Sequence, residues 1–220
     1  MTLRRRLLVA LPFIAWAGCF AVLGRYRTWL PFAYVGVALA LMALVTNADF
    51  VRRLRPSPLR VWTGVLAGAL MVGLTHLSYV WLAADVPSVV PATRALFKLL
   101  EVTGFSRFER AALITVIASS EEILFRGPLL SIGTGSTNRL ADARRPTRND
   151  WRRIFGSAAA YALVTAPLGS PLLMLCAFTC GSIWGCIGVA TSSLAAPILS
   201  HVIWDLGVLL IWPVTVAQGR

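Results

Sequence analysis

Residues 119–127 read Ser119-Ser120-Glu121-Glu122-Ile123-Leu124-Phe125-Arg126-Gly127, with two carboxylates and a guanidinium inside a long apolar segment. Charged side chains at membrane depth cost about 2.5–3.5 kcal/mol each on insertion scales. Glu122 and Arg126 are four residues apart with the glutamate first, the favourable order for an ion pair on one helix face. Glu121 points about 100° away from Glu122 and has no partner in the same stretch. We therefore interpret Glu122 and Arg126 as a structural pair and Glu121 as the carboxylate available for chemistry; a purely structural Glu121 is the alternative.

The composition is that of a membrane protein. The chain has 220 residues, of which 57% are hydrophobic and 14% are charged, whereas a soluble domain has about 25% charged residues. The net charge of +12 comes almost entirely from arginines in short segments between apolar runs. Such clusters are typical of topology signals and of contacts with lipid head groups. A nucleic-acid partner is not expected, because it would require a continuous basic stripe interleaved with aromatic residues.

Apolar segments of about 20 residues can span a bilayer. We expect about seven spans, at residues 7–24, 29–46, 61–84, 109–132, 154–168, 171–191 and 194–213. A polar hinge is expected over residues 47–60 and a polar loop over residues 134–153. An amphipathic helix over about residues 91–103 is expected to lie in the membrane interface. The predicted fold class is all-α: a polytopic transmembrane helix bundle plus one interfacial amphipathic helix, forming a single integral membrane domain over residues 1–220.

The arginine distribution also predicts the orientation. The N-terminus and the polar segments over residues 47–60 and 134–153 hold more arginines than the opposite side, so the N-terminus is expected in the cytoplasm. The expected location is a bacterial inner (cell) membrane. We interpret the first apolar run as a span rather than a cleaved signal, because it continues beyond Cys19.

The predicted spans contain few ionisable side chains, and such residues are functional candidates by default; they are His76, Glu121, Glu122, Arg126, His201 and Asp205. His201 and Asp205 are four residues apart and face the same side of the last helix. If they meet Glu121, a carboxylate can take a proton from water while a histidine donates to a developing oxyanion. The alternatives are that His201 and Asp205 form only an interhelical hydrogen bond and that His76 is a packing residue.

Two of these groups carry a family resemblance. Glu121-Glu122-Ile123-Leu124-Phe125-Arg126 and His201-Val202-Ile203-Trp204-Asp205 resemble the Glu-Glu-x-x-x-Arg and His-x-x-x-Asn/Asp motifs of the CPBP family of intramembrane proteases. That family includes the type II CAAX prenyl endopeptidases and bacteriocin-immunity-type proteins. The segment from Gly181 to Gly188 resembles its glycine-rich helix, in which small residues let helices approach closely. The resemblance covers about residues 110–210.

The resemblance implies an intramembrane endopeptidase acting on a membrane-anchored peptide or protein in the lipid bilayer. It assigns Glu121 as the general base that activates water, and Glu122 with Arg126 as the pair that fixes the helix. His201 and Asp205 would orient the water or stabilise the oxyanion. No cofactor is expected, and a zinc ion held by Glu121, His201 and Asp205 is the alternative.

The chain departs from the family in the middle motif, Phe-x-x-x-His. The corresponding residues are Tyr161 and Thr165, so threonine stands where the family has histidine. Threonine can hydrogen-bond but cannot take a proton near neutral pH, and His76 is the other histidine that could replace it. Two hypotheses stay open: a glutamate-dependent intramembrane endopeptidase, favoured by retention of the other motif residues, and a non-catalytic immunity, chaperone-like or assembly protein. A proton-coupled transporter is disfavoured, because no internal repeat is visible.

Overall fold

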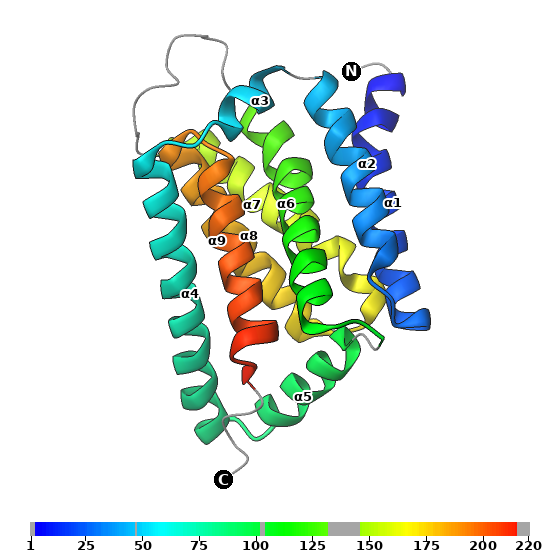
Figure 1. Cartoon of the computed structure of the whole chain (residues 1–220), viewed down its shortest axis with the longest axis vertical. Helices are drawn as coiled ribbons and strands as arrows, with labels where there is room; N and C mark the ends of the chain where they lie inside the picture. Colours follow the sequence, from blue (N-terminus) through cyan, green and yellow to red (C-terminus); the bar gives the residue numbers. More distant parts are fainter. Residues whose placement is uncertain (1–2, 47, 102–103, 132–145, 215–220) are drawn as a thin grey trace.

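The protein is a bundle of helices (Figure 1). The computed structural model describes residues 3–46, 48–101, 104–131 and 146–214. Within these ranges there are helices and short connections but no strand, so the all-α prediction is confirmed. The elements are α1 (Leu3–Tyr26), α2 (Leu30–Thr46), α3 (Ala48–Leu54), α4 (Pro58–Asp85), α5 (Val89–Leu100), α6 (Arg107–Ser131), α7 (Arg148–Val164), a 3-10 turn (Ala166–Leu168), α8 (Pro171–Thr191), α9 (Ala195–Asp205) and a π-helical extension (Leu206–Ile211).

Two predicted polar segments are partly wrong. Residues 47–60 contain α3, and α4 already begins at Pro58. The segment over residues 134–153 was expected to be a loop, yet α7 begins at Arg148. The reason is a capping box: Thr147 Oγ1 accepts from the backbone N–H of Asp150 at 3.3 Å, and Asp150 Oδ2 accepts from the backbone N–H of Thr147 at 2.9 Å. The part of that segment up to residue 145 lies outside the described residues.

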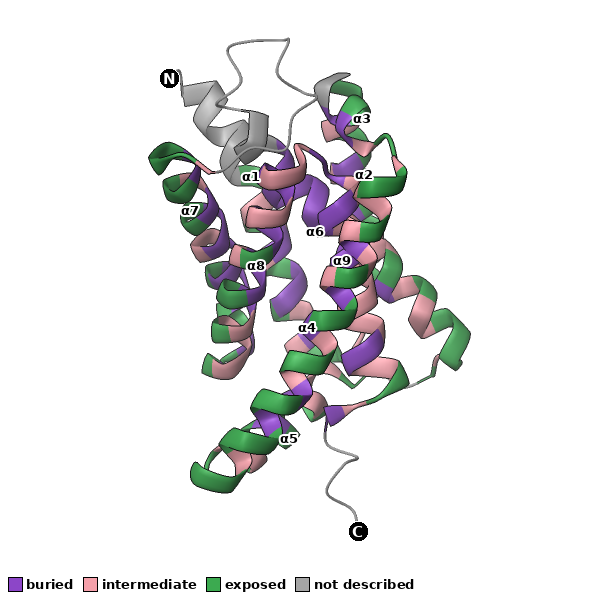
Figure 2. Ribbon diagram, turned by 90° about the vertical axis from the view of Figure 1, so that its left-hand side faces the viewer, coloured by how far each residue is buried: buried purple, intermediate pink, exposed green. Residues whose placement is uncertain are grey.

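The helices differ in how well they match a bilayer. Among the described residues, α4 and α8 are long and apolar enough to cross a membrane by length and composition. The shorter apolar helices are Leu11–Tyr26 in α1, Leu30–Thr46 (α2) and Ala195–Ile211, which is α9 with its extension. The number of spans therefore stays a prediction. The outward face of α4 is largely exposed (Figure 2) and carries a stripe of large apolar side chains, Leu59, Trp62, Leu66, Leu70, Leu74, Leu77 and Trp81. A stripe of this kind is suited to contact with lipid.

Helix α4 lies beside α9 at one edge of the bundle (Figure 1). Two glycines allow this approach. A Cβ atom added to Gly64 would lie 2.6 Å from the carbonyl oxygen of Ala196, and one added to Gly68 would lie 2.8 Å from the carbonyl oxygen of Ser200. Small residues let two helix backbones pack closely in this way. The contact fixes the position of α9, which carries His201.

We expect Gly68→Ala to destabilise the protein by about 1–3 kcal/mol, because the new methyl group meets backbone at a packed helix crossing. Gly73→Ala is the matched control on the same helix, since a Cβ atom there meets nothing within 4 Å. Replacing a helical glycine by alanine without a clash stabilises by roughly 0.5–1 kcal/mol. Thermal unfolding in detergent measures both changes, and an equal effect of the two variants would contradict the packing argument.

The start of α9 is also anchored. The carbonyl oxygen of Arg53, in α3, accepts hydrogen bonds from the backbone N–H of Leu194 at 3.0 Å and from the hydroxyl of Ser193 at 3.1 Å. Ser193 and Leu194 are fully buried. Helix α9 is thus held both at its first residues and along its length, facing α6 in the interior of the bundle.

Candidate active site

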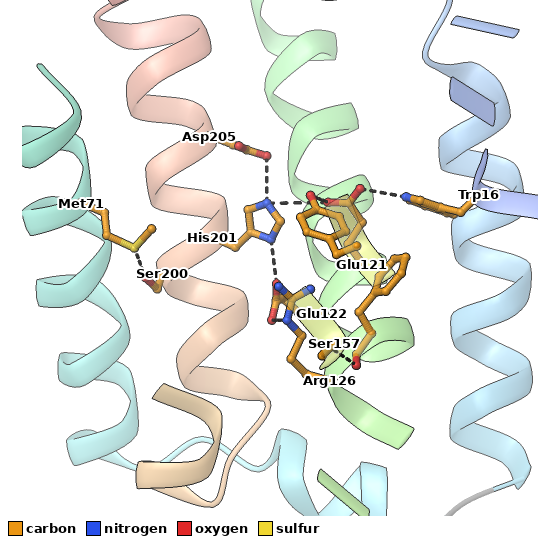
Figure 3. Close-up of polar contacts among 11 residues, drawn as sticks. Trp16, Met71, Glu121, Glu122, Arg126, Ser157, Ser200, His201 and Asp205 are labelled. Carbon is orange, nitrogen blue, oxygen red and sulfur yellow. Dashed lines mark hydrogen bonds and ion pairs between the residues drawn. The ribbon is translucent and has the colours of Figure 1, made fainter. Parts of the chain in front are cut away.

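His201 on α9 is surrounded by three carboxylates (Figure 3). Its Nδ1 lies 3.0 Å from Glu122 Oε1. Its Nε2 lies 3.7 Å from Glu121 Oε2 and 3.5 Å from Asp205 Oδ2. The two glutamates come from α6, which is distant in sequence from α9. The structure therefore brings together the residues that the two sequence motifs singled out.

The imidazole of His201 is held in a fixed orientation. Its ring stacks on Trp184 of α8, with 3.6 Å between ring centroids and an interplanar angle of 20°. Nδ1 is at hydrogen-bond distance from Glu122, whereas the separations of Nε2 from Glu121 and Asp205 are longer than a direct hydrogen bond. A carboxylate accepts from a ring N–H, so Glu122 assigns the donor role to Nδ1. Nε2 is then the atom that faces the other two carboxylates.

The predicted contact between Glu122 and Arg126 is present. Glu122 Oε2 lies 3.4 Å from Arg126 Nε, and both side chains are buried. Glu122 also has a partner that the sequence did not predict, because Oε1 of the same carboxylate contacts His201. Glu122 thus connects the arginine to the histidine.

The guanidinium of Arg126 packs against two aromatic rings and a glycine. Its guanidinium carbon lies 4.9 Å from the centroid of the Tyr161 ring and 5.7 Å from that of Trp184. A cation over an aromatic face gains energy from the ring quadrupole. A Cβ atom added to Gly181 would lie 2.8 Å from Arg126 Nη2. This close approach gives a specific reason for a glycine in the segment that resembles the family's glycine-rich helix.

Glu121 accepts no hydrogen bond from the described residues of its own stretch, as expected, but it has partners on other helices. Its Oε1 accepts a hydrogen bond from the indole N–H of Trp16 at 2.9 Å, and its Oε2 accepts from the hydroxyl of Tyr161 at 2.7 Å. Both donors come from other helices, α1 and α7. Sequence reasoning missed both roles: Tyr161 was visible as a position in the middle motif, while nothing in the sequence around Trp16 indicated a site residue.

Thr165 and His76 lie apart from this hydrogen-bond network. Thr165 caps the C-terminus of α7, and its hydroxyl donates to the carbonyl oxygen of Ala162 at 2.7 Å. His76 on α4 stacks on Trp212, with 3.9 Å between ring centroids. The contacts of the described residues join neither side chain to Glu121 or His201. His76 therefore does not take the place of the middle-motif histidine in this structure.

A metal site was the alternative interpretation of these residues. In residues 3–46, 48–101, 104–131 and 146–214, no group of three or more His, Cys, Asp or Glu side chains is arranged to hold a metal ion. In the ligand set named for zinc, His201 Nε2 lies 3.7 Å from Glu121 Oε2 and 3.5 Å from Asp205 Oδ2. That the protein works without a cofactor stays a prediction.

The fold and the site define a class: an all-helical membrane protein with a buried centre of carboxylates around one histidine. The family model described as type II CAAX prenyl endopeptidase Rce1-like matches residues 104–207, slightly less than half of the chain. This segment is similar to that family, and it contains both motifs that carried the resemblance in the sequence. Searches of curated proteins and of solved structures gave no significant match. The matched segment includes every site residue described above except Trp16.

Proposed function

We propose that this protein is a glutamate-dependent intramembrane endopeptidase that hydrolyses a peptide bond in a membrane-anchored peptide or protein. The observation that carries the proposal is the contact of His201 with Glu121, Glu122 and Asp205 in one buried cluster. A bundle that needed only a structural ion pair would be served by Glu122 and Arg126 alone. Burial of two further carboxylates is costly, and hydrolytic chemistry gives a reason for it.

In the proposed reaction, Glu121 takes a proton from water as the water oxygen bonds to the scissile carbonyl carbon. The carbonyl oxygen becomes an oxyanion, and the N–H at His201 Nε2 donates to it. A ring that donates through both nitrogens, to Glu122 and to the oxyanion, is the doubly protonated form, and the adjacent carboxylates supply its counter-charge. The C–N bond then breaks, and the proton held by Glu121 passes to the leaving nitrogen.

The remaining motif residues orient this pair. Glu122 fixes the histidine ring, and Arg126 fixes Glu122. Asp205 is the least buried of the carboxylates, with its side chain 16% exposed, and orients His201 at Nε2. Thr165 is assigned no proton transfer, since its hydroxyl is bonded within its own helix. The proposal further puts the protein in a bacterial inner (cell) membrane. The arginine distribution supports a cytoplasmic N-terminus.

A non-catalytic role as a membrane immunity, chaperone-like or assembly protein is the second candidate. One observation favours it: the residue at the position of the middle-motif histidine is Thr165, whose hydroxyl is turned to Ala162. In that case the buried cluster would serve only to hold α6 against α9.

The deciding experiment compares the wild type with Glu121→Gln in proteoliposomes, using membrane-anchored peptides and beginning with a prenylated CAAX peptide. We expect the variant to lose about 10²–10⁴-fold in kcat, because an amide cannot take the proton from water. Glu101→Gln, at an exposed position, is the matched control. Mass spectrometry of the products identifies the bond that is cut. Equal processing by the wild type and Glu121→Gln would remove Glu121 as the base. No processing by the wild type would favour the non-catalytic candidate.

A further inference from the structure

Each oxygen of the Glu121 carboxylate accepts a hydrogen bond from a different aromatic residue. Trp16 Nε1 donates to Oε1 at 2.9 Å, and Tyr161 donates through its hydroxyl to Oε2 at 2.7 Å. We propose that Trp16 and Tyr161 are the positioning residues of Glu121, and that Tyr161 supplies from α7 the hydrogen bond that Thr165 does not make. The inference rests on the proposed function, because Trp16 and Tyr161 can affect kcat through Glu121 only if Glu121 acts as the base.

The two donors are chemically different, and this makes the two oxygens of the Glu121 carboxylate unequal. An indole N–H can only donate, so Oε1 stays an acceptor whether or not Glu121 has taken a proton. A phenol both donates and accepts. The Tyr161 oxygen can therefore accept from a proton on Oε2 after Glu121 has taken one from water, whereas the indole of Trp16 cannot do the same at Oε1. Oε2 is also the oxygen nearest to His201 Nε2, at 3.7 Å.

Trp16 is held rigidly enough to serve this role. It is fully buried, and its ring packs edge-on against Phe32 of α2, with centroids 5.2 Å apart. A Cβ atom added to Gly36 would lie 2.9 Å from Trp16 Cη2 and 3.0 Å from the Cβ atom of Ser120. Gly36 of α2 thus leaves room for the indole of Trp16 between α2 and α6.

Tyr161 is held by the arginine of the first motif. Its ring contacts Phe125, with centroids 5.0 Å apart, and lies under the guanidinium of Arg126. Its hydroxyl reaches Glu121 one helical turn before Thr165, whose own hydroxyl remains on Ala162. The donor from α7 to the general base therefore comes from the aromatic position of the middle motif rather than from its last position.

The kinetic test uses Tyr161→Phe, which removes one oxygen atom and keeps the ring. We expect kcat to fall about 10- to 100-fold with KM within about twofold of the wild type, since the residue acts through Glu121 and not on the substrate. Tyr79→Phe, a buried tyrosine on α4, is the matched control and is expected to keep wild-type kcat. Trp16→Phe is expected to lower kcat in the same way, with the exposed Trp62→Phe as its control.

A second measurement needs no substrate. We expect Tyr161→Phe to lower the Tm in detergent by about 2–4 °C, the shift for loss of roughly 1 kcal/mol in a chain of this size. In a Glu121→Leu background the same substitution should shift the Tm by much less, because its partner is gone. Equal Tm shifts in both backgrounds would show that Tyr161 and Glu121 are not coupled, and this would overturn the inference. The test does not depend on whether Trp16→Phe folds.

The outcomes separate this inference from the proposed function. If Glu121→Gln is inactive while Tyr161→Phe keeps wild-type kcat, the inference fails and the proposed function stands. If Tyr161→Phe raises KM without changing kcat, the hydroxyl contacts substrate and the positioning role is overturned. If Glu121→Gln remains active, the proposed function fails, and the role of Tyr161 as a positioning residue for a base fails with it.

Discussion

His201→Ala is expected to abolish peptide hydrolysis and to destabilise the protein in the same experiment. The imidazole lies within 4 Å of Glu121, Glu122 and Asp205 and accounts for the contacts between α9 and the two glutamates of α6. Its removal takes away the oxyanion donor of the proposed reaction and leaves buried carboxylates without their shared partner. Removing one member of a buried charged group costs about 3–5 kcal/mol.

The matched control is His76→Ala, the other histidine of the chain. It is also buried, and it stacks on Trp212 in the way that His201 stacks on Trp184. The control therefore removes a stacked, buried imidazole without touching the carboxylates. Peptide cleavage in proteoliposomes and thermal unfolding in detergent are measured on both variants. Hydrolysis that survives His201→Ala, or is lost equally in His76→Ala, would contradict the assigned role.

Arg126→Leu is expected to destabilise the protein about as strongly as His201→Ala. The guanidinium is 1% exposed and stands between the carboxylate of Glu122 and the rings of Tyr161 and Trp184. Without it Glu122 keeps only His201, and we expect a loss of about 3–5 kcal/mol. Arg126→Lys should recover part of this loss by restoring the charge, although a lysine lacks the planar group that lies over the two rings.

Thermal unfolding in detergent measures this series, with Arg94→Leu on the exposed side of α5 as the control. The control should change the Tm by little, because exposed charges contribute roughly 0–1 kcal/mol. We also expect lower kcat in Arg126→Lys, since Glu122 orients His201 and Tyr161 packs under the guanidinium. A Tm for Arg126→Leu equal to that of the wild type would refute the buried pair as a stabilising element.

The local parts of the site follow from the sequence because helical periodicity determines them. Glu122 with Arg126, and His201 with Asp205, are each four residues apart, and each pair is in contact in the structure. The apolar segments likewise predicted the positions of the main helices, because a long apolar run must satisfy its backbone hydrogen bonds internally. The family resemblance also predicts that the two pairs belong to one site.

The long-range contacts could not be predicted in this way. Trp16 and Tyr161 reach Glu121 across 105 and 40 residues of sequence, and neither has a charged neighbour to mark it. The bond from His201 to Glu122 depends on the register between α6 and α9, which the glycines of α4 and the anchor at Arg53 help to set. Periodicity gives the face of a helix on which a residue lies, but not which helix it meets.

The hydrogen bond from Trp16 shows that the buried cluster is not contained in the family-matched segment alone. The segment that matches the family begins at residue 104, so its sequence alone contains the carboxylate but not the donor to Oε1. Trp16, Gly36 and Ser120 fit one another sterically across three helices. A larger side chain at residue 36 would displace the indole and with it the donor to Oε1. The surroundings of the Glu121 carboxylate thus extend to an indole in α1 and a glycine in α2, both outside the segment that the family model matches.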